Sequence, residues 1–268
     1  MKCYKKKEMK FRITGISDTH NKHKQLNGKL PGGDILIHSG DITSLGRKHE
    51  VSDFIKWFGK QDYTYKVFIA GNHDMSFDRE KLLRDKLAHF EGRDRTDYDT
   101  ECAEGKPDWL KDMLAVGLDG GTFYLEDTGI DIEGIKIWGS PYSPSFGHGW
   151  GFNKDRGYDI AQCWNQIPID TDIVITHTPI YGYNDRALNT NQNVGCSDLY
   201  HRMHEVKPHL HFAGHIHEGY GYGTIPYKDS WGDIYTFNPS TCNLRYEAIN
   251  KPITFDYDFE SRQLEFLM

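Results

Sequence analysis

Short apolar runs that end at glycine or at a polar residue are the feature of this sequence that most constrains its fold. Six runs rich in Ile, Val and Phe have the length of buried strands. They cover residues 11–17, 34–40, 65–71, 135–140, 172–177 and 209–215. Between two of them, residues 46–60 place Val51, Phe54 and Phe58 on one face of a helix. Strands that alternate with helices predict parallel pairing and an α/β fold.

The carboxyl-terminal third of the chain shows a different pattern. A second helix is predicted over residues 197–208, with Ser197 as its N-cap and Pro208 beyond its end. After residue 227 strand-like runs follow one another without helices, which suggests antiparallel strands that complete a sheet. These runs cover residues 233–238, 252–259 and 263–268.

The predicted organisation is a single domain with two atypical segments. Residues 1–10 form a basic amino-terminal tail, and residues 11–268 form the domain. Within it, residues 91–106 are charged, mainly acidic and nearly free of aliphatic side chains. We expect this segment to be a solvated surface insertion.

Composition narrows the class of protein. The chain of 268 residues has 37% apolar and 26% charged residues, as ordinary globular proteins do. The net charge of −7 argues against a general nucleic-acid binder, and no basic stripe indicates a long nucleic-acid groove. The five cysteines are scattered without a Cys-x-x-Cys pair, and no apolar stretch approaches the roughly 20 residues of a membrane span. We expect a cytoplasmic protein.

Polar side chains follow five of the six predicted strands, close to where each strand ends. They are Asp18, His20, Asp41, Asn72, His73, Asp74, His177, His215 and His217. Any one of them alone could equally be a turn residue or a helix cap. The carboxyl ends of parallel strands meet at one edge, where α/β proteins bind ligands, so five such ends indicate a shared site.

The chemistry of this set points to metal ions. Leaving His73 and Asp74 aside, it offers two carboxylates, one carboxamide oxygen and four imidazoles, without sulfur. Imidazole with carboxylate suits Mn, Fe, Co, Ni or Zn better than Ca. Seven groups are too many for one tetrahedral ion but suit two ions that share a carboxylate. The pair His215 and His217 could then reach neighbouring ions from one turn.

These motifs resemble the five-block signature of calcineurin-like metallophosphoesterases. The blocks are Asp18-x-His20, Gly40-Asp41, Gly71-Asn72-His73-Asp74, His177 and Gly214-His215-x-His217, in the same order. More narrowly, residues 148–153, 194–196, 217–221 and 238–242 are similar to the metallophosphoesterase-domain-containing phosphodiesterases of animals. Some members of that subgroup lack the histidine that corresponds to His215, which this chain retains.

The resemblance implies a fold and a set of roles. It implies a four-layer α/β/β/α sandwich, in which helices flank two mixed β-sheets. One ion would be held by Asp18, His20, Asp41 and His217. The second ion would be held by Asp41, Asn72, His177 and His215, so that Asp41 bridges. His73 corresponds to the position that contacts the leaving group, and Asp74 to the position that orients His73.

The expected reaction is hydrolysis of small phosphodiesters, such as cyclic nucleotides, by a hydroxide that bridges the two ions. His73 would protonate the departing oxygen, and Asp74 would fix its ring. The ions would be Mn, Fe, Zn, Co or Ni, with Mn supporting activity in vitro. A phosphomonoesterase or protein phosphatase, a nuclease, and a non-catalytic nucleotide-binding scaffold are the alternatives.

Several other residues have roles that remain open at this stage. His38 lies inside an apolar strand and is interpreted as a buried core histidine. Arg156 either contacts phosphate or forms a local salt bridge. The aromatic residues of the loop 140–153 either stack on a base or pack against the sheet; they are Tyr142, Phe146, Trp150 and Phe152. His148 in the same loop has no clear role.

Overall fold

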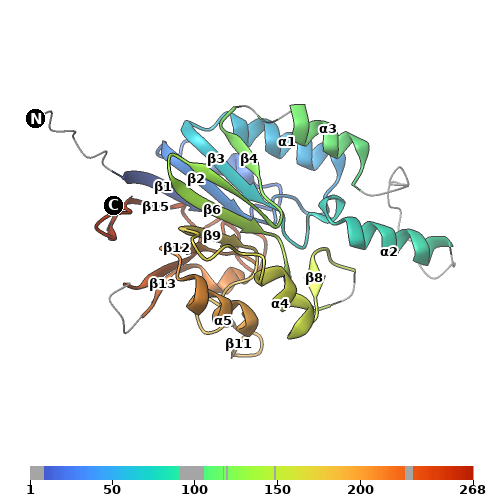
Figure 1. The fold of residues 1–268 in the computed structure, drawn as a ribbon. Coiled ribbons are helices and arrows are strands. Elements are labelled where there is room, and N and C mark those ends of the chain that lie inside the picture. Colours follow the sequence, from blue (N-terminus) through green and yellow to red (C-terminus); the bar gives the residue numbers. More distant parts are fainter. Residues whose placement is uncertain are drawn as a thin grey trace, which may run out of the picture.

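The apolar runs fold into two sheets that pack face to face, and helices cover both outer faces (Figure 1). This computed structural model describes residues 9–90, 106–116, 118, 120–147, 149–226 and 232–267. Most of the basic tail, at residues 1–8, and residues 91–105 of the acidic segment lie outside the described residues. The predicted four-layer α/β/β/α sandwich is confirmed.

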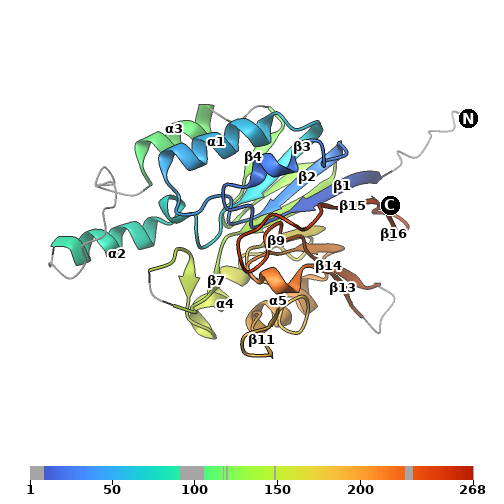
Figure 2. The same cartoon turned by 180° about the vertical axis from the view of Figure 1, so that it is seen from behind.

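The first sheet has six strands, and four of them run parallel. In spatial order they are β16 (Gln263–Phe266), β15 (Ile253–Asp258), β1 (Lys10–Ile16), β2 (Gly33–Ser39), β3 (Tyr63–Ile69) and β4 (Thr122–Tyr124). The strands β1 to β4 pair in parallel, whereas β15 pairs antiparallel with both β1 and β16. The last two strands of the chain therefore extend the first sheet beside β1 (Figure 2).

The second sheet also has six strands. In spatial order they are β13 (Gly221–Ile225), β14 (Ile234–Asn238), β12 (Leu210–Phe212), β9 (Ile173–Thr176), β6 (Ile135–Ser140) and β5 (Thr128–Ile132). The four central strands are parallel, and the edge strands β13 and β5 are antiparallel. The run 233–238 forms β14, which pairs antiparallel with β13 as expected and also pairs in parallel with β12, a pairing that was not expected.

Helices cover the outer face of each sheet. Those over the first sheet are α1 (Lys48–Gly59) and α3 (Asp108–Val116), and α2 (Arg79–Phe90) projects beside them (Figure 1). The helices over the second sheet are α4 (Tyr158–Trp164) and α5 (Ser197–Val206). Helix α5 is capped by Cys196, whose sulfur accepts from the Leu199 amide, and not by Ser197 as the sequence suggested.

Short elements connect the layers. They are η1 (His23–Leu26), η2 (Met75–Phe77), η3 (His217–Gly219), β7 (Ser143–Pro144), β8 (Asn153–Lys154), β10 (Arg186–Ala187) and β11 (Gln192–Asn193). The interior between the sheets is apolar and includes Ile13 and Ile37 from the first sheet and Ile175 and Phe212 from the second. Separate apolar clusters lie under α1 with α3 and under α4 with α5. Burial on both faces explains why the central strands read as continuous apolar runs.

Candidate metal centre

The predicted ligands come together from the ends of strands in both sheets. Strands β1, β2 and β3 of the first sheet lead into Asp18, His20, Asp41 and Asn72, and β9 and β12 of the second lead into His177, His215 and His217. The site therefore lies where two facing sheets end, and not along the edge of a single sheet as the strand pattern alone suggested. The Ser39 hydroxyl donates to the Ala213 carbonyl, which ties the two sheets together beside the site.

Sharp turns aim the ligands inward. Asp18, His20, Asp41 and His215 all have positive φ, between 39° and 67°, which is uncommon for residues other than glycine. Backbone strain of this kind clusters at functional sites. Neighbouring backbone must also approach closely, because a Cβ at Gly214 would lie 2.3 Å from a carboxylate oxygen of Asp18. Glycine is therefore required in the Gly-His-x-His segment for close approach.

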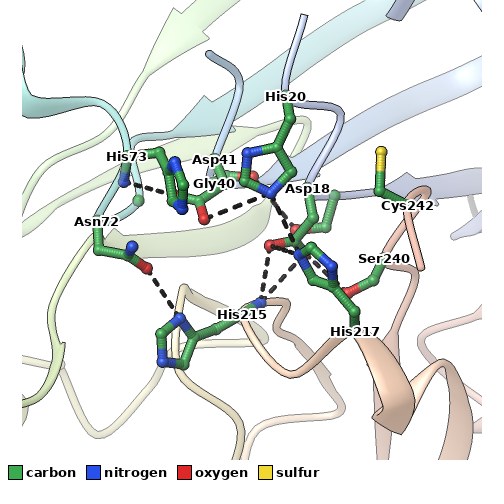
Figure 3. Close-up of polar contacts among 12 residues, drawn as sticks. Asp18, His20, Gly40, Asp41, Asn72, His73, His215, His217, Ser240 and Cys242 are labelled. Carbon is green, nitrogen blue, oxygen red and sulfur yellow. Dashed lines mark hydrogen bonds and ion pairs between the residues drawn. The ribbon is translucent and has the colours of Figure 1, made fainter. Parts of the chain in front are cut away.

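Two groups of ligand atoms lie on either side of Asp41. In one group Asp18, His20 and His217 have ligand atoms within 4.8 Å of one another, and in the other Asp41, His177 and His215 do. His20 Nε2 lies 3.7 Å from Asp41 Oδ2, and His177 Nε2 lies 3.4 Å from Asp41 Oδ1. Each oxygen of Asp41 thus faces one group, which is the geometry of a bridging carboxylate. Figure 3 shows the contact with His20.

Hydrogen bonds fix which ring nitrogen faces the site. The Nδ1 atoms of His20, His177 and His217 lie 3.3, 3.0 and 2.9 Å from the carbonyls of Thr43, Ser39 and Asn243. A carbonyl only accepts, so each Nδ1 carries a proton, and in its neutral form each ring presents the Nε2 lone pair to the site. Partners of this kind hold metal-binding histidines in the ligating tautomer.

The side-chain oxygen of Asn72 completes the second group. It lies 3.0 Å from His177 Nε2 and 2.8 Å from His215 Nδ1 (Figure 3 shows the latter contact). His215 therefore presents Nδ1, unlike the other three histidines. The carboxamide oxygen is a lone-pair donor aimed at two imidazole nitrogens, as expected where a cation would be shared among them.

The electrostatics of the cluster favour bound positive charge. Burial disfavours the charged form of Asp18, but His217 outweighs it and lowers the pKa of Asp18. Burial likewise opposes the imidazolium of His217, but the hydrogen bond and charge of Asp18 raise the pKa of His217 to about 9. Burial also opposes the charged form of His177, and Asp41 outweighs it, raising the pKa of His177 to about 9. The buried carboxylates thus hold two cationic charges nearby, a role that protons fill here and divalent ions can fill.

His73 lies at the mouth of the site, outside the two predicted groups of metal ligands. Its Nδ1 donates to the Ser44 carbonyl at 2.8 Å, which leaves Nε2 free, and its backbone amide donates to Asp41 at 2.8 Å. The ring is half-buried and packs edge-on against His20, with centroids 4.5 Å apart. His73 could also ligate, since it lies within 4.8 Å of His20 and Asp41.

The expectation that Asp74 orients the His73 ring is wrong. The buried Asp74 carboxylate accepts from the amides of Ile42, Thr43 and Gly71 at 3.1, 2.9 and 2.8 Å, and from the Thr43 hydroxyl at 2.6 Å. Its side chain turns back into the loop after β2 because four donors converge there. Asp74 therefore joins two ligand-bearing loops, whereas the Ser44 carbonyl holds His73.

A small cavity opens over the ligands. Its volume is about 170 Å³, and it is lined by five of the site residues together with Phe146, Trp150, Leu244 and Tyr246. Among the described residues no lysine or arginine lines it. Ligand pockets usually measure about 300–1,000 Å³, so this one fits a small group with the remainder of a substrate outside.

The aromatic residues of the loop 140–153 fall into two groups, those that line the cavity and those that pack in the core. Phe146 and Trp150 line the cavity, whereas Phe152 is buried and packs against Tyr142 in the cluster under α1. Arg156 donates to the carbonyls of Val194 and Gly195, so it anchors a loop and does not face the cavity. His148 lies outside the described residues.

His38 and His211 have structural roles. His38 is buried and shares a 2.9 Å hydrogen bond with Thr19, as the sequence indicated. His211 is buried between the hydroxyls of Thr176 and Thr236. Neither has a ligand atom in the clusters of the described residues.

Sequence reasoning missed three residues at this site. The Ser240 hydroxyl donates to Asp18 Oδ2 at 2.8 Å, and the Asn243 carbonyl holds His217 (Figure 3 shows Ser240). Tyr246 packs against His20 and His217, with centroids 4.8 and 5.6 Å away. The run 238–242 had been noted only as a point of resemblance, and no spacing pattern marks residues 243–246.

None of the helices in the described part of the chain combines the length and the apolar character that crossing a membrane requires.

Fold and donor set together define the class of a metal-dependent hydrolase built on a two-sheet sandwich. The chain belongs to the calcineurin-like phosphoesterase family, whose signature matches residues 11–219. It is similar to metallophosphoesterase domain-containing protein 1 of Homo sapiens and of Mus musculus, each 37% identical over 252 residues. That alignment covers 91% of this chain and 70% of either relative.

The fold has solved counterparts. Phosphopantetheinyl hydrolase from Mycobacterium tuberculosis aligns with a TM-score of 0.54 over 96% of this chain and 95% of that chain. The two sequences are 14% identical, so this likeness concerns the fold. A structure from Thermus thermophilus aligns equally well, with a TM-score of 0.54 over 96% of this chain and 98% of that chain at 14% identity.

Proposed function

We propose that the protein is a dinuclear metal-dependent phosphodiesterase that acts on small diesters such as cyclic nucleotides. The observation that carries this proposal is the cavity over the two clusters of metal-binding groups, whose lining, among the described residues, has no lysine or arginine. A phosphomonoester is a dianion and gains from additional cationic side chains, whereas a diester carries one negative charge. The cavity therefore favours the diester.

The donor set fits two divalent ions. The first would be held by Asp18, His20, Asp41 and His217, and the second by Asp41, Asn72, His177 and His215. When bound, such ions lower the pKa of water and offset the charge on phosphate oxygens. The mixture of imidazole and carboxylate without sulfur suits Mn, Fe, Co, Ni or Zn, and we propose Mn as the ion that supports activity in vitro.

His73 is the residue proposed to act on the leaving group. In its cationic form Nε2–H donates to the departing oxygen while Nδ1–H stays bound to the Ser44 carbonyl. The contact with Trp150, at 4.2 Å between centroids, restricts rotation of the ring. The Asp41 carboxylate accepts a hydrogen bond from the His73 amide, which places the proposed general acid, His73, beside the carboxylate proposed to bridge the two ions.

The test compares hydrolysis of bis(p-nitrophenyl) phosphate, p-nitrophenyl phosphate, and 2′,3′- and 3′,5′-cyclic nucleotides by one manganese-loaded sample of known metal content. We expect kcat/KM to be higher for the diesters. A preference of more than about tenfold for the monoester, about 1.4 kcal/mol in transition-state binding, would contradict the proposal. Full metal occupancy without hydrolysis of any ester would support a non-catalytic scaffold instead.

A further inference from the structure

Two aromatic rings from distant parts of the chain meet at His73. The ring centroid of Trp150, which precedes β8, lies 4.2 Å from that of His73, and the ring centroid of Tyr246 lies 6.0 Å from it. Both rings line the cavity that also contains Asp41 and Asn72. An indole does not ligate metals, and the Tyr246 ring packs against His20 and His217, so both rings form walls of the site.

The two rings flank one imidazole at the mouth of the site. Their centroids lie 4.2 and 6.0 Å from that of His73, so they are no more than about 10 Å apart. Trp150 is half-buried and Tyr246 is exposed, so part of each ring is accessible from the cavity that both of them line. A flat ring that enters the cavity can therefore stack on these walls.

Tyr246 is held in place by a built turn. Its φ is +57°, a conformation that bulky side chains rarely adopt. Asn243 supports the turn: its side-chain oxygen accepts from the amides of Arg245 and Glu247 at 2.9 and 3.0 Å, and its carbonyl accepts from the Tyr246 amide at 2.9 Å. The same carbonyl accepts from His217, so one residue positions both the aromatic wall and a predicted ligand.

Trp150 is anchored to the opposite ligand loop. The next residue, Gly151, donates its amide to the Asn72 carbonyl at 2.9 Å, and the Phe152 amide donates to Asp78 at 2.6 Å. Phe152 is buried, which fixes the end of the loop in the core. Both walls are therefore tied by hydrogen bonds to segments that carry predicted metal ligands, and little ordering remains to be done on binding.

We propose that Trp150 and Tyr246 form an aromatic slot, walled by these two rings, that binds a planar ring carried by the group esterified to the phosphate. The slot would make the site select aryl or nucleobase-bearing phosphate esters over aliphatic ones of equal size. This inference rests on the proposed function, because it places the phosphate at the two ligand clusters. A flat ring then lies over His73 beside the scissile bond.

The test measures binding and not turnover. Benzylphosphonate and cyclohexylmethylphosphonate are stable monoester analogues of similar size that differ in whether the ring is flat. Calorimetry on the manganese-loaded protein should show benzylphosphonate binding roughly fivefold or more tightly, the lower end of the strength of stacking on aromatic side chains. Equal dissociation constants for the two ligands would overturn the slot.

Variants assign the effect to the two rings. Trp150→Ala and Tyr246→Ala should bring the ratio of the two dissociation constants towards one, whereas Tyr246→Phe should preserve it. Tyr158→Ala is the matched control, because Tyr158 is 78% exposed and lies outside the cavity. If Tyr246→Ala loses metal, Tyr246→Leu, Tyr246→Phe and Trp150→Ala decide the outcome. An unchanged ratio in Trp150→Ala and Tyr246→Leu would contradict the proposal.

The two proposals fail separately. Loss of the binding preference with diester hydrolysis intact would contradict the slot alone. A clear preference for the flat phosphonate in a protein that hydrolyses no diester would support the slot and contradict the phosphodiesterase.

Discussion

The Nε2 atoms of His20 and His217 face each other at 3.2 Å (Figure 3). Both rings use their Nδ1–H to donate to a backbone carbonyl, so two lone pairs would point at each other if both rings were neutral. Such a contact is repulsive unless a cation or a proton lies between the two atoms. Asp18 Oδ1 lies 3.5 Å from His217 Nε2 and adds a negative charge at the same point. The fold thus builds a position for positive charge.

Removing one imidazole from this pair should remove one ion. We expect His217→Ala to lower the manganese content from two ions per chain to one, because the group around Asp41, His177 and His215 is left intact. Elemental analysis after gel filtration measures this. His201→Ala, at an exposed position of α5, should keep two ions. Two ions retained in His217→Ala would exclude that residue as a ligand.

Ser240 should tune metal affinity without ligating. Its hydroxyl donates to Asp18 Oδ2, and loss of such a supporting hydrogen bond typically weakens metal binding about 10- to 100-fold. We therefore expect Ser240→Ala to raise the dissociation constant for manganese by that factor. Ser76→Ala is the control, since the Ser76 hydroxyl has no hydrogen-bond partner among the described residues. Equal affinities of Ser240→Ala and wild type would refute the supporting role.

The free energy of unfolding should depend on pH differently in the metal-free and in the metal-loaded protein. The pKa of His217 and of His177 is about 9 in the metal-free fold, above the ordinary 6.5. A raised folded-state pKa stabilises the fold fully below pH 6.5, and this stabilisation disappears as the pH rises through about 9. Urea unfolding in EDTA should therefore show lower stability at pH 9.5 than at pH 6.5.

At acid pH the stability of the fold should change in the opposite direction, because a carboxylate and not a histidine titrates there. The pKa of Asp18 is lowered from its ordinary 3.8, so its stabilising effect is present above that pH and is lost as the pH falls further.

Protons also compete with metal for the imidazole nitrogens, so manganese affinity should increase from pH 6.5 towards pH 9. Calorimetric titrations at three pH values check this. Affinity that is independent of pH would contradict imidazole ligation.

His73 should affect turnover more than metal content. We expect His73→Ala to lower kcat on a diester by about 100- to 10,000-fold, the usual effect of a general acid, with both ions retained. The loss should be smaller for a diester with a p-nitrophenolate leaving group, which needs less protonation, than for an alkyl leaving group. Equal losses on both substrates would assign His73 another role, such as ligation.

Asp74→Asn should lower the free energy of unfolding. The carboxylate accepts hydrogen bonds from four donors, and an amide supplies one oxygen while its NH₂ group faces donors. Leaving buried donors unpaired costs about 1–3 kcal/mol each, so the free energy of unfolding should fall by at least that amount. Urea unfolding of the metal-free protein measures it. A variant with wild-type stability would contradict the structural role.

Much of the site was predictable because it is local in sequence. Each ligand lies within a few residues of a strand end, and Asp41 or His177 can be found by reading along one run. The structure brings together all seven predicted ligands. Their division between two sheets was not visible from the strands alone, since the apolar pattern of a buried strand does not reveal its neighbour.

The errors share a cause. The parallel pairing of β14 with β12 was not expected, and Asp74 was expected to orient His73, but pairing and side-chain direction depend on distant segments. The same holds for the supporting residues, because Ser240 reaches Asp18 across 222 positions of the chain. Contacts between residues so far apart in the sequence cannot be predicted from composition or periodicity.

Anomalous diffraction from a crystal grown with manganese is the most direct test of the central claim, that the two ligand groups hold two ions bridged by Asp41. We predict two anomalous peaks, one beside each oxygen of the Asp41 carboxylate, about 3.5–4 Å apart. A single peak elsewhere, or none near Asp41 at saturating manganese, would contradict the account.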